Sequence, residues 1–406
     1  MTTGTTTGSA GPTARKPAAR GLPGWVFVLF VTLLATATDE FVIAGVLPSV
    51  ADDLGVSVSA AGQLVTVFAV VYALGAPTLA AVCERFPKRE LMAAALLVFV
   101  AANVAAALAP GYGFLLAARI LAALAAAVVT SAAFATVAAA APEGQSGRYL
   151  GVVTAGMTTA LFTGVPVGSW LGGALDWRAT FWLIAGVGAV AALGLLATAP
   201  ALAGSAPAPL RERLAPLRNG RVLRLVAVTF LAAGGGLMFY TYLGVYAAEV
   251  APDTPGLLSA LLFVVGVTGL AGALLAGRLT DARGPRRGLR LVIGGHAVLL
   301  ALAAALAFGP LDGAAALVAL VAVTGCWSVF AWGLNPPVQG SVLAAAGPAA
   351  GMTALALNIS ALYLGTGVAA ALGGAVLGAA DARAVPVVGA ALLTLSFLLT
   401  PGRERR

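Results

Sequence analysis

The chain has 406 residues, of which 60% are apolar and only 9% are charged, and its formal net charge is +8. Soluble domains usually carry about 25% charged residues, so a soluble fold of this length could not cover its surface with so little charge. Lipid is therefore the expected solvent for most side chains. The positive charges are spread over six separate segments, which argues against a nucleic-acid partner and for a lipid bilayer.

Long uncharged windows predict helices that cross a membrane, because a helical span needs about 20 largely apolar residues. The first span, 24–47, forms only if two acidic residues inside it are tolerated. The window 313–380 is long enough for two helices, with a break near Gly347-Pro348. Strands of a β-barrel alternate polar and apolar residues, and the run 121–141, rich in Ala, Leu and Val, does not. The sequence therefore predicts an all-α membrane protein of twelve transmembrane helices, whose other windows are 54–83, 91–118, 120–142, 149–175, 179–210, 225–248, 254–277, 291–311 and 384–402.

Lysine and arginine concentrate on one side of the predicted membrane. With the N-terminus inside, the inner segments hold twenty of the 23 basic residues, and the outer loops hold only Arg178 and Arg383. This asymmetry places both termini in the cytoplasm. The ratio of 21 arginines to 2 lysines, with abundant Ala and Gly, is typical of a GC-rich bacterial genome. We therefore expect a multi-pass protein of the bacterial inner membrane.

A long inner segment divides the twelve spans into two sets of six. Glu84 and Asp281 align at an offset of 197 residues, and the same offset places Arg89 on Arg286. This recurrence is typical of transporters built from parallel repeats, with the substrate site between the halves. The predicted organisation is a disordered cytoplasmic N-terminus (1–23), an N-terminal six-helix bundle (24–199), a cytoplasmic linker (200–221), a C-terminal six-helix bundle (222–400) and a cytoplasmic tail (401–406).

Several motifs give this pattern a family resemblance. The segment 277–287 resembles the signature Gly-x-Leu-x-Asp-x-x-Gly-x-Arg-Arg of the major facilitator superfamily. The runs 40–48 and 176–182 resemble the twelve-spanner drug:proton antiporters of that superfamily, a branch that includes chloramphenicol-resistance, sugar-efflux and nucleoside-efflux proteins. The resemblance implies the major facilitator fold of two pseudo-symmetric six-helix bundles. The first copy of the signature departs from the pattern at Ala80, Glu84 and Pro87.

Glycine and proline recur in order along the fifth span, at Gly164, Pro166, Gly168 and Gly172. Small residues let membrane helices approach closely, and proline permits a bend. Glycine-rich packing occurs in any such bundle, so packing alone is the alternative interpretation. The ordered spacing resembles the antiporter signature of the superfamily's drug exporters, which implies exchange of one solute for another.

The first span contains an acidic pair, Asp39 and Glu40. A carboxylate in the membrane interior is costly unless it is protonated, paired or facing water, so it is a functional candidate. Burial favours the protonated form of a carboxyl group, which suits proton uptake and release. Adjacent residues on a helix point about 100° apart, so the two need not share a role. We predict proton coupling and favour Glu40, whose sequence context matches the antiporter branch; the alternative is that one acid merely solvates the outer water funnel.

Arg119 is the only basic residue within a predicted span. Glu40 lies ~10 Å from the outer end of its span, and Arg119 lies ~9 Å from the outer end of its own, at 1.5 Å per residue. A cation at that depth would stabilise a charged carboxylate, and its departure would promote protonation. The alternative is a structural arginine bound to backbone carbonyls. At the offset of 197 residues, the positions that correspond to Asp39, Glu40 and Arg119 are uncharged: Gly236, Leu237 and Ala316. Proton handling is therefore expected in the first half.

The two inner loops that carry the repeated motif are predicted to act as gating latches. An acid near a helix end can pair with arginines in one conformation and separate from them in another. The alternative is positive-inside anchoring alone, which accounts for the arginines but not for the acid at the matched position. The residues concerned are Glu84, Arg85 and Arg89 in the first loop, and Gly277, Asp281, Arg286 and Arg287 in the second.

Aromatic and polar side chains of the second half are candidates for the wall of a substrate cavity. Ligand pockets typically combine aromatic walls with few polar groups, and the alternative is that these side chains only pack or lie at the membrane interface. His296, the only histidine, is expected to be an ordinary packed or hydrogen-bonded residue. The candidates are Tyr240 and Tyr242 in the seventh span, Trp327 and Trp332 in the tenth, and Asn358 in the eleventh.

Catalytic motifs are missing from the sequence. Neither lysine has the context of a phosphate-binding loop, and no His/Cys cluster suggests a metal. We therefore expect no enzyme activity, no cofactor, no catalytic residue and no metal site. The predicted function is secondary active efflux of a small, amphipathic drug or metabolite in exchange for protons, by alternating access in a monomer. The alternatives are a sugar/nucleoside or uncoupled exporter of the same fold, and a non-transporting membrane sensor or receptor.

Overall fold

The computed structural model of the protein describes residues 21–83, 85–142, 145–204, 215–252, 254–347 and 351–400, and within them every regular element is a helix. Glu84, residues 205–214 of the expected linker and nearly all of the two expected tails lie outside the described residues. The helices are α1 (Gly24–Asp53), α2 (Val58–Cys83), α3 (Lys88–Ala107), α4 (Tyr112–Ala140), α5 (Ser146–Thr159), the π-helical turn η1 (Ala160–Gly164), α6 (Val165–Ala174), α7 (Trp177–Thr198), the 3-10 turn η2 (Ala215–Arg218), α9 (Gly220–Thr241), α10 (Leu243–Val250), α11 (Leu257–Arg283), α12 (Pro285–Phe308), α13 (Gly313–Trp332), α14 (Asn335–Ala346), α15 (Gly351–Ala379) and α16 (Ala384–Leu399).

Eleven stretches of the described residues are long and apolar enough to cross a membrane. One of them joins α5, η1 and α6, and another joins α13 and α14. The apolar helix α16 occupies the place of the expected twelfth span but has only 16 residues. At 1.5 Å per residue it is ~24 Å long, against a hydrocarbon core of about 30 Å. The protein is thus an all-helical, multi-pass membrane protein.

Glycine and proline interrupt several spans. Pro166 follows η1, where the missing N–H and the ring of proline disturb the regular hydrogen-bond ladder of the helix. Pro336 and Pro337 stand in the first turn of α14, directly after the break from α13. The predicted break near Gly347-Pro348 is present, since α14 ends at Ala346 and Gly347 has a φ of 73°.

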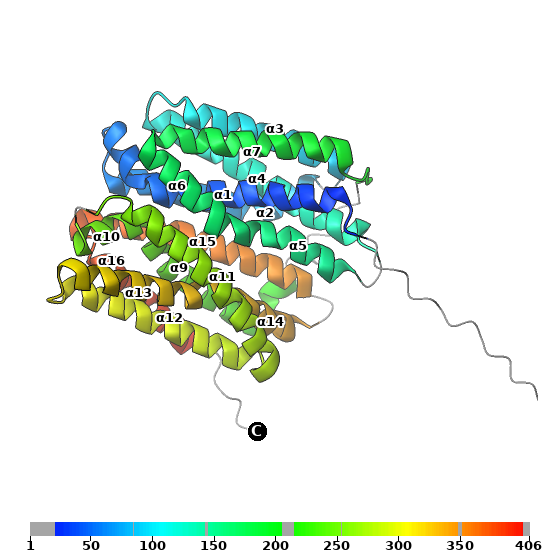
Figure 1. Ribbon diagram of the computed structural model, residues 1–406. Coiled ribbons are helices and arrows are strands. Elements are labelled where there is room, and N and C mark those ends of the chain that lie inside the picture. Colours follow the sequence, from blue (N-terminus) through cyan, green and yellow to red (C-terminus); the bar gives the residue numbers. More distant parts are fainter. Residues whose placement is uncertain are drawn as a thin grey trace, which may run out of the picture.

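The helices form two bundles that lie side by side (Figure 1). α1 to α7 make up the first bundle, in which α3 packs against α4 and α7, and α1 against α5, α6 and α7. α9 to α16 make up the second, in which α9 packs against α15 and α16, and α11 against α13. The two bundles meet where α15 lies along α2 and where α11 lies along η1 and α6. Any ligand site between them is therefore built from α1, α2, α9, α11 and α15 or their neighbours.

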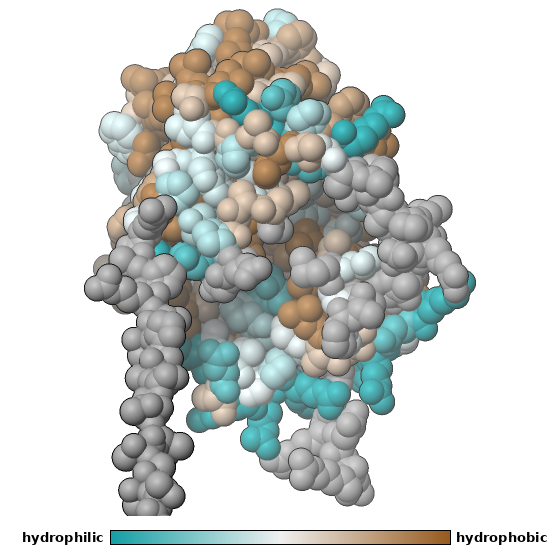
Figure 2. Space-filling view, turned by 90° about the vertical axis from the view of Figure 1, so that its right-hand side faces the viewer, coloured by the Kyte–Doolittle hydropathy of each residue, from teal (hydrophilic) through white to brown (hydrophobic). Residues whose placement is uncertain are grey.

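The two ends of the molecule differ in polarity. At one end α1 and α9 begin, and the turn between α11 and α12 carries exposed arginines, so we call it the arginine-rich end. Figure 2 shows this end, where hydrophilic side chains gather and the centre of the face is hollowed. The arginines described there include Arg221, Arg278, Arg283, Arg286 and Arg287.

Close packing of α6 against α1 fixes the helix that carries the acidic pair. Three glycines spaced by four residues face three side chains of α1 with the same spacing, so that a methyl group on any of them would collide with its neighbour. Such small-xxx-small patterns bring membrane helices together. The packing role proposed for the ordered glycines therefore has a definite partner. The pairs are Gly164 with Thr38, Gly168 with Val42, and Gly172 with Val46.

We predict that Gly168→Val destabilises the protein. A Cβ atom at Gly168 would lie 2.6 Å from Val42 Cγ2, so α6 and α1 must separate, and overpacking of this kind typically costs about 1–3 kcal/mol. The thermal melting of purified protein in detergent measures the effect. Gly173→Val is the matched control, because no atom lies within 4 Å of a Cβ atom at that position; equal losses from both variants would contradict the packing argument.

Candidate functional site

Asp39 and Glu40 lie in the middle of α1 but point to different surroundings. Asp39 is completely buried and faces its own bundle, whereas Glu40 is half-buried and lines a cavity between the bundles. The separation follows from helix geometry, since adjacent residues point about 100° apart. The two carboxyl groups therefore have distinct environments, as the sequence allowed.

Asp39 forms an ion pair with Arg119 of α4. Arg119 Nη1 lies 2.5 Å from Asp39 Oδ1, and Nη2 donates to the backbone carbonyl of Asp39 at 3.2 Å. The guanidinium carbon lies 4.3 Å from the centre of the Phe68 ring. Within the described part of the chain, Asp39 Oδ2 and Arg119 Nε have no hydrogen-bond partner. Arg119 thus reaches the acidic pair as its depth suggested, but the carboxylate that it binds is Asp39 rather than Glu40.

Glu40 is bound from the other bundle. The hydroxyl of Tyr363, on α15, donates to Glu40 Oε2 at 3.0 Å. The Tyr363 ring stacks on that of Tyr72, on α2, with 4.1 Å between the ring centres. The hydrogen bond to Glu40 therefore crosses the boundary between the two bundles.

A cavity of about 360 Å³, which includes space open to solvent, lies beside Glu40. Its walls come from α1 and α2 of the first bundle and from α9 and α15 of the second. Glu40 is the only charged residue in a wall that is otherwise apolar, aromatic or hydroxyl-bearing. Such a lining suits a small molecule with a large apolar surface. The other lining residues are Phe41, Ile43, Ala44, Val65, Phe68, Ala69, Leu237, Tyr240, Thr241 and Thr366.

Three of the five candidate substrate residues lie together near this cavity. Tyr240 lines it, and its ring packs edge-on against Phe41 and Trp332. Trp327 lies behind Trp332, with 5.8 Å between ring centres, and is completely buried. These rings form a continuous aromatic wall that extends from the cavity into the second bundle.

Tyr242 and Asn358, the other two candidates, lie away from the cavity wall. Tyr242 is buried and donates to the carbonyl of Ala370 at 2.7 Å, and Asn358 accepts a hydrogen bond from Thr229 at 2.7 Å. Their polar groups are thus bound within the second bundle. His296 is packed as expected, 5.9 Å from the Trp327 ring, but its ring nitrogens have no hydrogen-bond partner among the described residues.

Tyr363 and Tyr72 are site residues that were not predicted from the sequence. Each is a tyrosine within an apolar span, and a buried tyrosine hydroxyl usually finds a hydrogen-bond partner. That signal was present in the sequence, but it gives no direction for the side chain. The contact with Glu40 depends on how α15 crosses α1 and α2, which only the tertiary structure shows.

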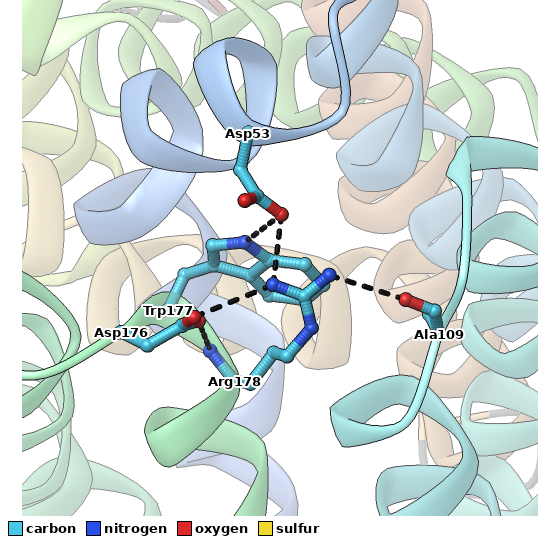
Figure 3. Close-up of polar contacts among 5 residues, drawn as sticks. All are labelled: Asp53, Ala109, Asp176, Trp177 and Arg178. Atoms are coloured by element: carbon cyan, nitrogen blue, oxygen red, sulfur yellow. Dashed lines mark hydrogen bonds and ion pairs between the residues drawn. The ribbon is translucent and has the colours of Figure 1, made fainter.

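A polar network ties the first bundle together at the end opposite the arginine-rich end (Figure 3). Arg178 Nη1 lies 2.7 Å from Asp53 Oδ2 and 3.4 Å from Asp176 Oδ2, and Nη2 donates to the carbonyl of Ala109 at 3.3 Å. Trp177 Nε1 donates to the same Asp53 oxygen at 3.1 Å. The network joins the end of α1, the loop after α3 and the start of α7, so these elements would move as one body.

The candidate gating loops lie at the arginine-rich end. In the first loop, Arg89 donates to the carbonyl of Leu196 on α7, and the Arg85 guanidinium lies 4.8 Å from the centre of the Phe86 ring. Glu84 is outside the described residues. In the second loop, Asp281, Arg286 and Arg287 are exposed and Gly277 is half-buried at the turn from α11 to α12.

A sequence model of the Major Facilitator Superfamily matches residues 29–352 of the chain. The MFS-type transporter YbcL of Bacillus subtilis (strain 168) is 33% identical over 368 residues, which cover 90% of this chain and 92% of YbcL. The chloramphenicol resistance protein of Streptomyces lividans is 38% identical over 270 residues, which cover 64% of this chain and 68% of that protein. Among solved structures, a bacterial homologue of the human lysosomal transporter Spinster, in an inward-facing and unoccupied conformation, has a TM-score of 0.69 at 16% identity and covers 93% of this chain and 96% of its own.

The chain belongs to the major facilitator superfamily. The family resemblance of its motifs is confirmed, and so is the fold of two helical bundles. The protein is therefore a membrane transporter and not an enzyme.

We predict that Arg119→Gln strongly destabilises the protein. The substitution leaves the buried Asp39 carboxylate without its cation, and loss of one partner of a buried pair typically costs about 3–5 kcal/mol. The measurement is thermal unfolding in detergent. Adding Asp39→Asn should restore most of the loss, because the charge is then removed as well.

Arg178→Gln is the matched control for Arg119→Gln. Its ion pairs with Asp53 and Asp176 are partly exposed, so water screens them and the loss of stability should be much smaller. A similar loss from both arginine variants, or no recovery in the double variant of Asp39 and Arg119, would argue against the buried pair as the source of the effect.

Proposed function

We propose that the protein is a secondary active exporter that exchanges a small, amphipathic drug or metabolite for protons by alternating access. The observation that carries this proposal is the position of Glu40, whose carboxyl group faces an aromatic cavity between the two bundles. A carboxyl group in such a place can meet both an exported molecule and a proton. Competition between the two for one site couples their opposite movements, because each ligand favours a different state of the transporter.

The two acids of α1 have different roles in this proposal. Asp39 is held by Arg119 inside the first bundle and remains the charged partner of that pair. Glu40, which lies on the cavity side, carries the proton. The absence of charges at the matched positions of the second half agrees with proton handling by the first bundle.

Alternating access requires the bundles to separate at one end while they close at the other. A contact across the boundary at the end opposite the arginine-rich end supports a closed state there: Ser169 Oγ of α6 lies 3.1 Å from Ser259 Oγ of α11. Ser169 also donates to the Gly45 carbonyl of α1, within the first bundle, at 3.1 Å. The hollow at the arginine-rich end supports an opening on that side (Figure 2). The loops with Asp281 and Glu84 would act as latches at the arginine-rich end.

The cavity and the relatives support the proposed substrate class. Its apolar and aromatic wall suits an amphipathic molecule, and one relative is a chloramphenicol resistance protein. We place the arginine-rich end and both termini in the cytoplasm of a bacterial cell, with a monomer in the inner membrane and bundle limits at 24–199 and 222–400. An uncoupled exporter, or one for sugars or nucleosides, is the alternative that the transport assay distinguishes.

We predict that Glu40→Gln abolishes proton coupling. Cells expressing the protein are first screened for resistance to varied antibiotics, to find an exported compound. Proteoliposomes with wild-type protein should then move protons when that compound is added, whereas Glu40→Gln should lower this movement at least tenfold, because an amide cannot release a proton. Compound-for-compound exchange without a proton gradient should persist in the variant.

Glu249→Gln is the matched control, since Glu249 pairs with Arg383 at the surface and lies outside the cavity. It should keep wild-type proton movement. Wild-type export that does not respond to the proton gradient would defeat the proposal in favour of an uncoupled exporter.

We also predict that a disulfide between positions 169 and 259 stops transport. The variant Ser169→Cys/Ser259→Cys should cross-link under mild oxidation, because the native hydroxyl oxygens are 3.1 Å apart, and the bond would hold the closed end shut. Transport should fall under oxidation and return with a reductant. Each single variant is the control, and full transport by the cross-linked protein would contradict alternating access at this contact.

A further inference from the structure

The two acids of the site differ in which bundle supplies their partner. The Asp39–Arg119 pair joins α1 to α4, and both helices belong to the first bundle. The Glu40–Tyr363 hydrogen bond joins α1 to α15 of the second bundle. A rocking motion of one bundle against the other leaves the first contact intact, whereas it must stretch or break the second.

Arg119 is engaged with Asp39, and its hydrogen bonds among the described residues go to Asp39 and not to Glu40. One of its terminal nitrogens is bound to the Asp39 carboxylate and the other to the Asp39 carbonyl, while its flat face covers the Phe68 ring. Tyr363 is the only side chain whose hydrogen bond to the Glu40 carboxylate is found among the described residues. The charged form of Glu40 therefore depends on a donor from the opposite bundle.

The Tyr363 ring is held in place for this contact. It is buried and stacks on Tyr72 at 4.1 Å, and Tyr72 in turn stacks on Phe68 at 6.3 Å. Phe68 is the ring that lies under the Arg119 guanidinium. A stack of aromatic rings thus runs from the buried ion pair to the hydroxyl that binds Glu40.

We propose that Tyr363 is the positioning residue that couples the protonation of Glu40 to the relative position of the two bundles. While the bundles are arranged as in this structure, its hydroxyl stabilises the charged carboxylate; when they move apart, that hydrogen bond is lost and the protonated acid is favoured. No covalent step is involved, and the proton is exchanged with water in the cavity. The proposal rests on the proposed function, in which Glu40 carries the proton.

The ionisable groups that interact with Glu40 come from α1 itself and from α2, α4, α9 and α15. Asp39 precedes it on α1, Arg119 faces it from α4, Tyr72 from α2, Tyr240 from α9 and Tyr363 from α15. Asp39 and Arg119 bind each other, and the Tyr240 hydroxyl is directed to the carbonyl of Phe41 at 3.3 Å. Tyr363 is the member of this set that both binds Glu40 and moves with the second bundle.

The test is a pH titration of purified protein by infrared difference spectroscopy, which needs no substrate. The carboxylic acid band that is absent from Glu40→Gln belongs to Glu40. In Tyr363→Phe, which keeps the ring stack and removes the hydroxyl, the midpoint of this band should rise by about one pH unit, the shift expected when a hydrogen bond to a charged group is lost. Tyr363→Phe in the Glu40→Gln background should change nothing further.

The control is Tyr246→Phe, which removes another buried hydroxyl, bonded to the Ala303 carbonyl at 2.7 Å and remote from Glu40. Its midpoint should match that of the wild-type protein. If Tyr363→Phe fails to fold, 3-fluorotyrosine at position 363 replaces it; this residue keeps the ring and is a stronger donor, so the midpoint should fall. An unchanged midpoint in either case overturns the role of Tyr363.

Failure of the proposed function gives a different result. If Glu40→Gln retains substrate-driven proton movement in proteoliposomes, Glu40 is not the proton carrier and both proposals fall. If Glu40→Gln abolishes the movement while Tyr363→Phe leaves the Glu40 midpoint and the pH profile of transport unchanged, only the coupling role of Tyr363 is lost.

Discussion

The ion pair between Asp39 and Arg119 is the contact on which the rest of the site depends. Both groups are almost completely buried, and a charge at this depth is tolerated only when it is paired or reaches water. Because the guanidinium is occupied by Asp39 and by the Phe68 face, it leaves Glu40 for other partners. One acid thereby becomes a structural element of the first bundle, and the other becomes available to the cavity.

The glycines of η1 and α6 hold the two acids in these orientations. They let η1 and α6 lie directly on Thr38, Val42 and Val46 of α1, side chains that extend along the helix on both sides of the acidic pair. A helix held so closely cannot rotate about its axis without collisions, so Asp39 keeps facing α4 while Glu40 keeps facing the cavity. The motif that resembles an antiporter signature is thus a packing device for α1, and its functional consequence is the orientation of the two acids.

Much of this arrangement could be predicted from the sequence, because lipid imposes simple rules. Apolar windows and the Gly347 break located most spans, and depth alone brought Arg119 to the acidic pair. The choice between Asp39 and Glu40 as its partner was beyond such reasoning, since it depends on the rotation of α1 relative to α4. The contact of Tyr363 with Glu40 depends in the same way on how helices from distant parts of the chain cross. The same crossing geometry places Tyr242 and Asn358 away from the cavity.

The two bundles differ in the side chains that they supply to the site, so the site depends on contacts between them. The first bundle holds the buried charges, and the matched positions of the second are uncharged. The second bundle supplies instead an aromatic wall with Tyr240, Trp332 and Trp327, and the hydroxyl of Tyr363. A proton on the first bundle can influence the second only through groups that span the boundary. Glu40 and Tyr363 form such a link at the edge of the cavity. In the proposed function, the ligand, the proton and the movement of the bundles would therefore meet at this one carboxyl group.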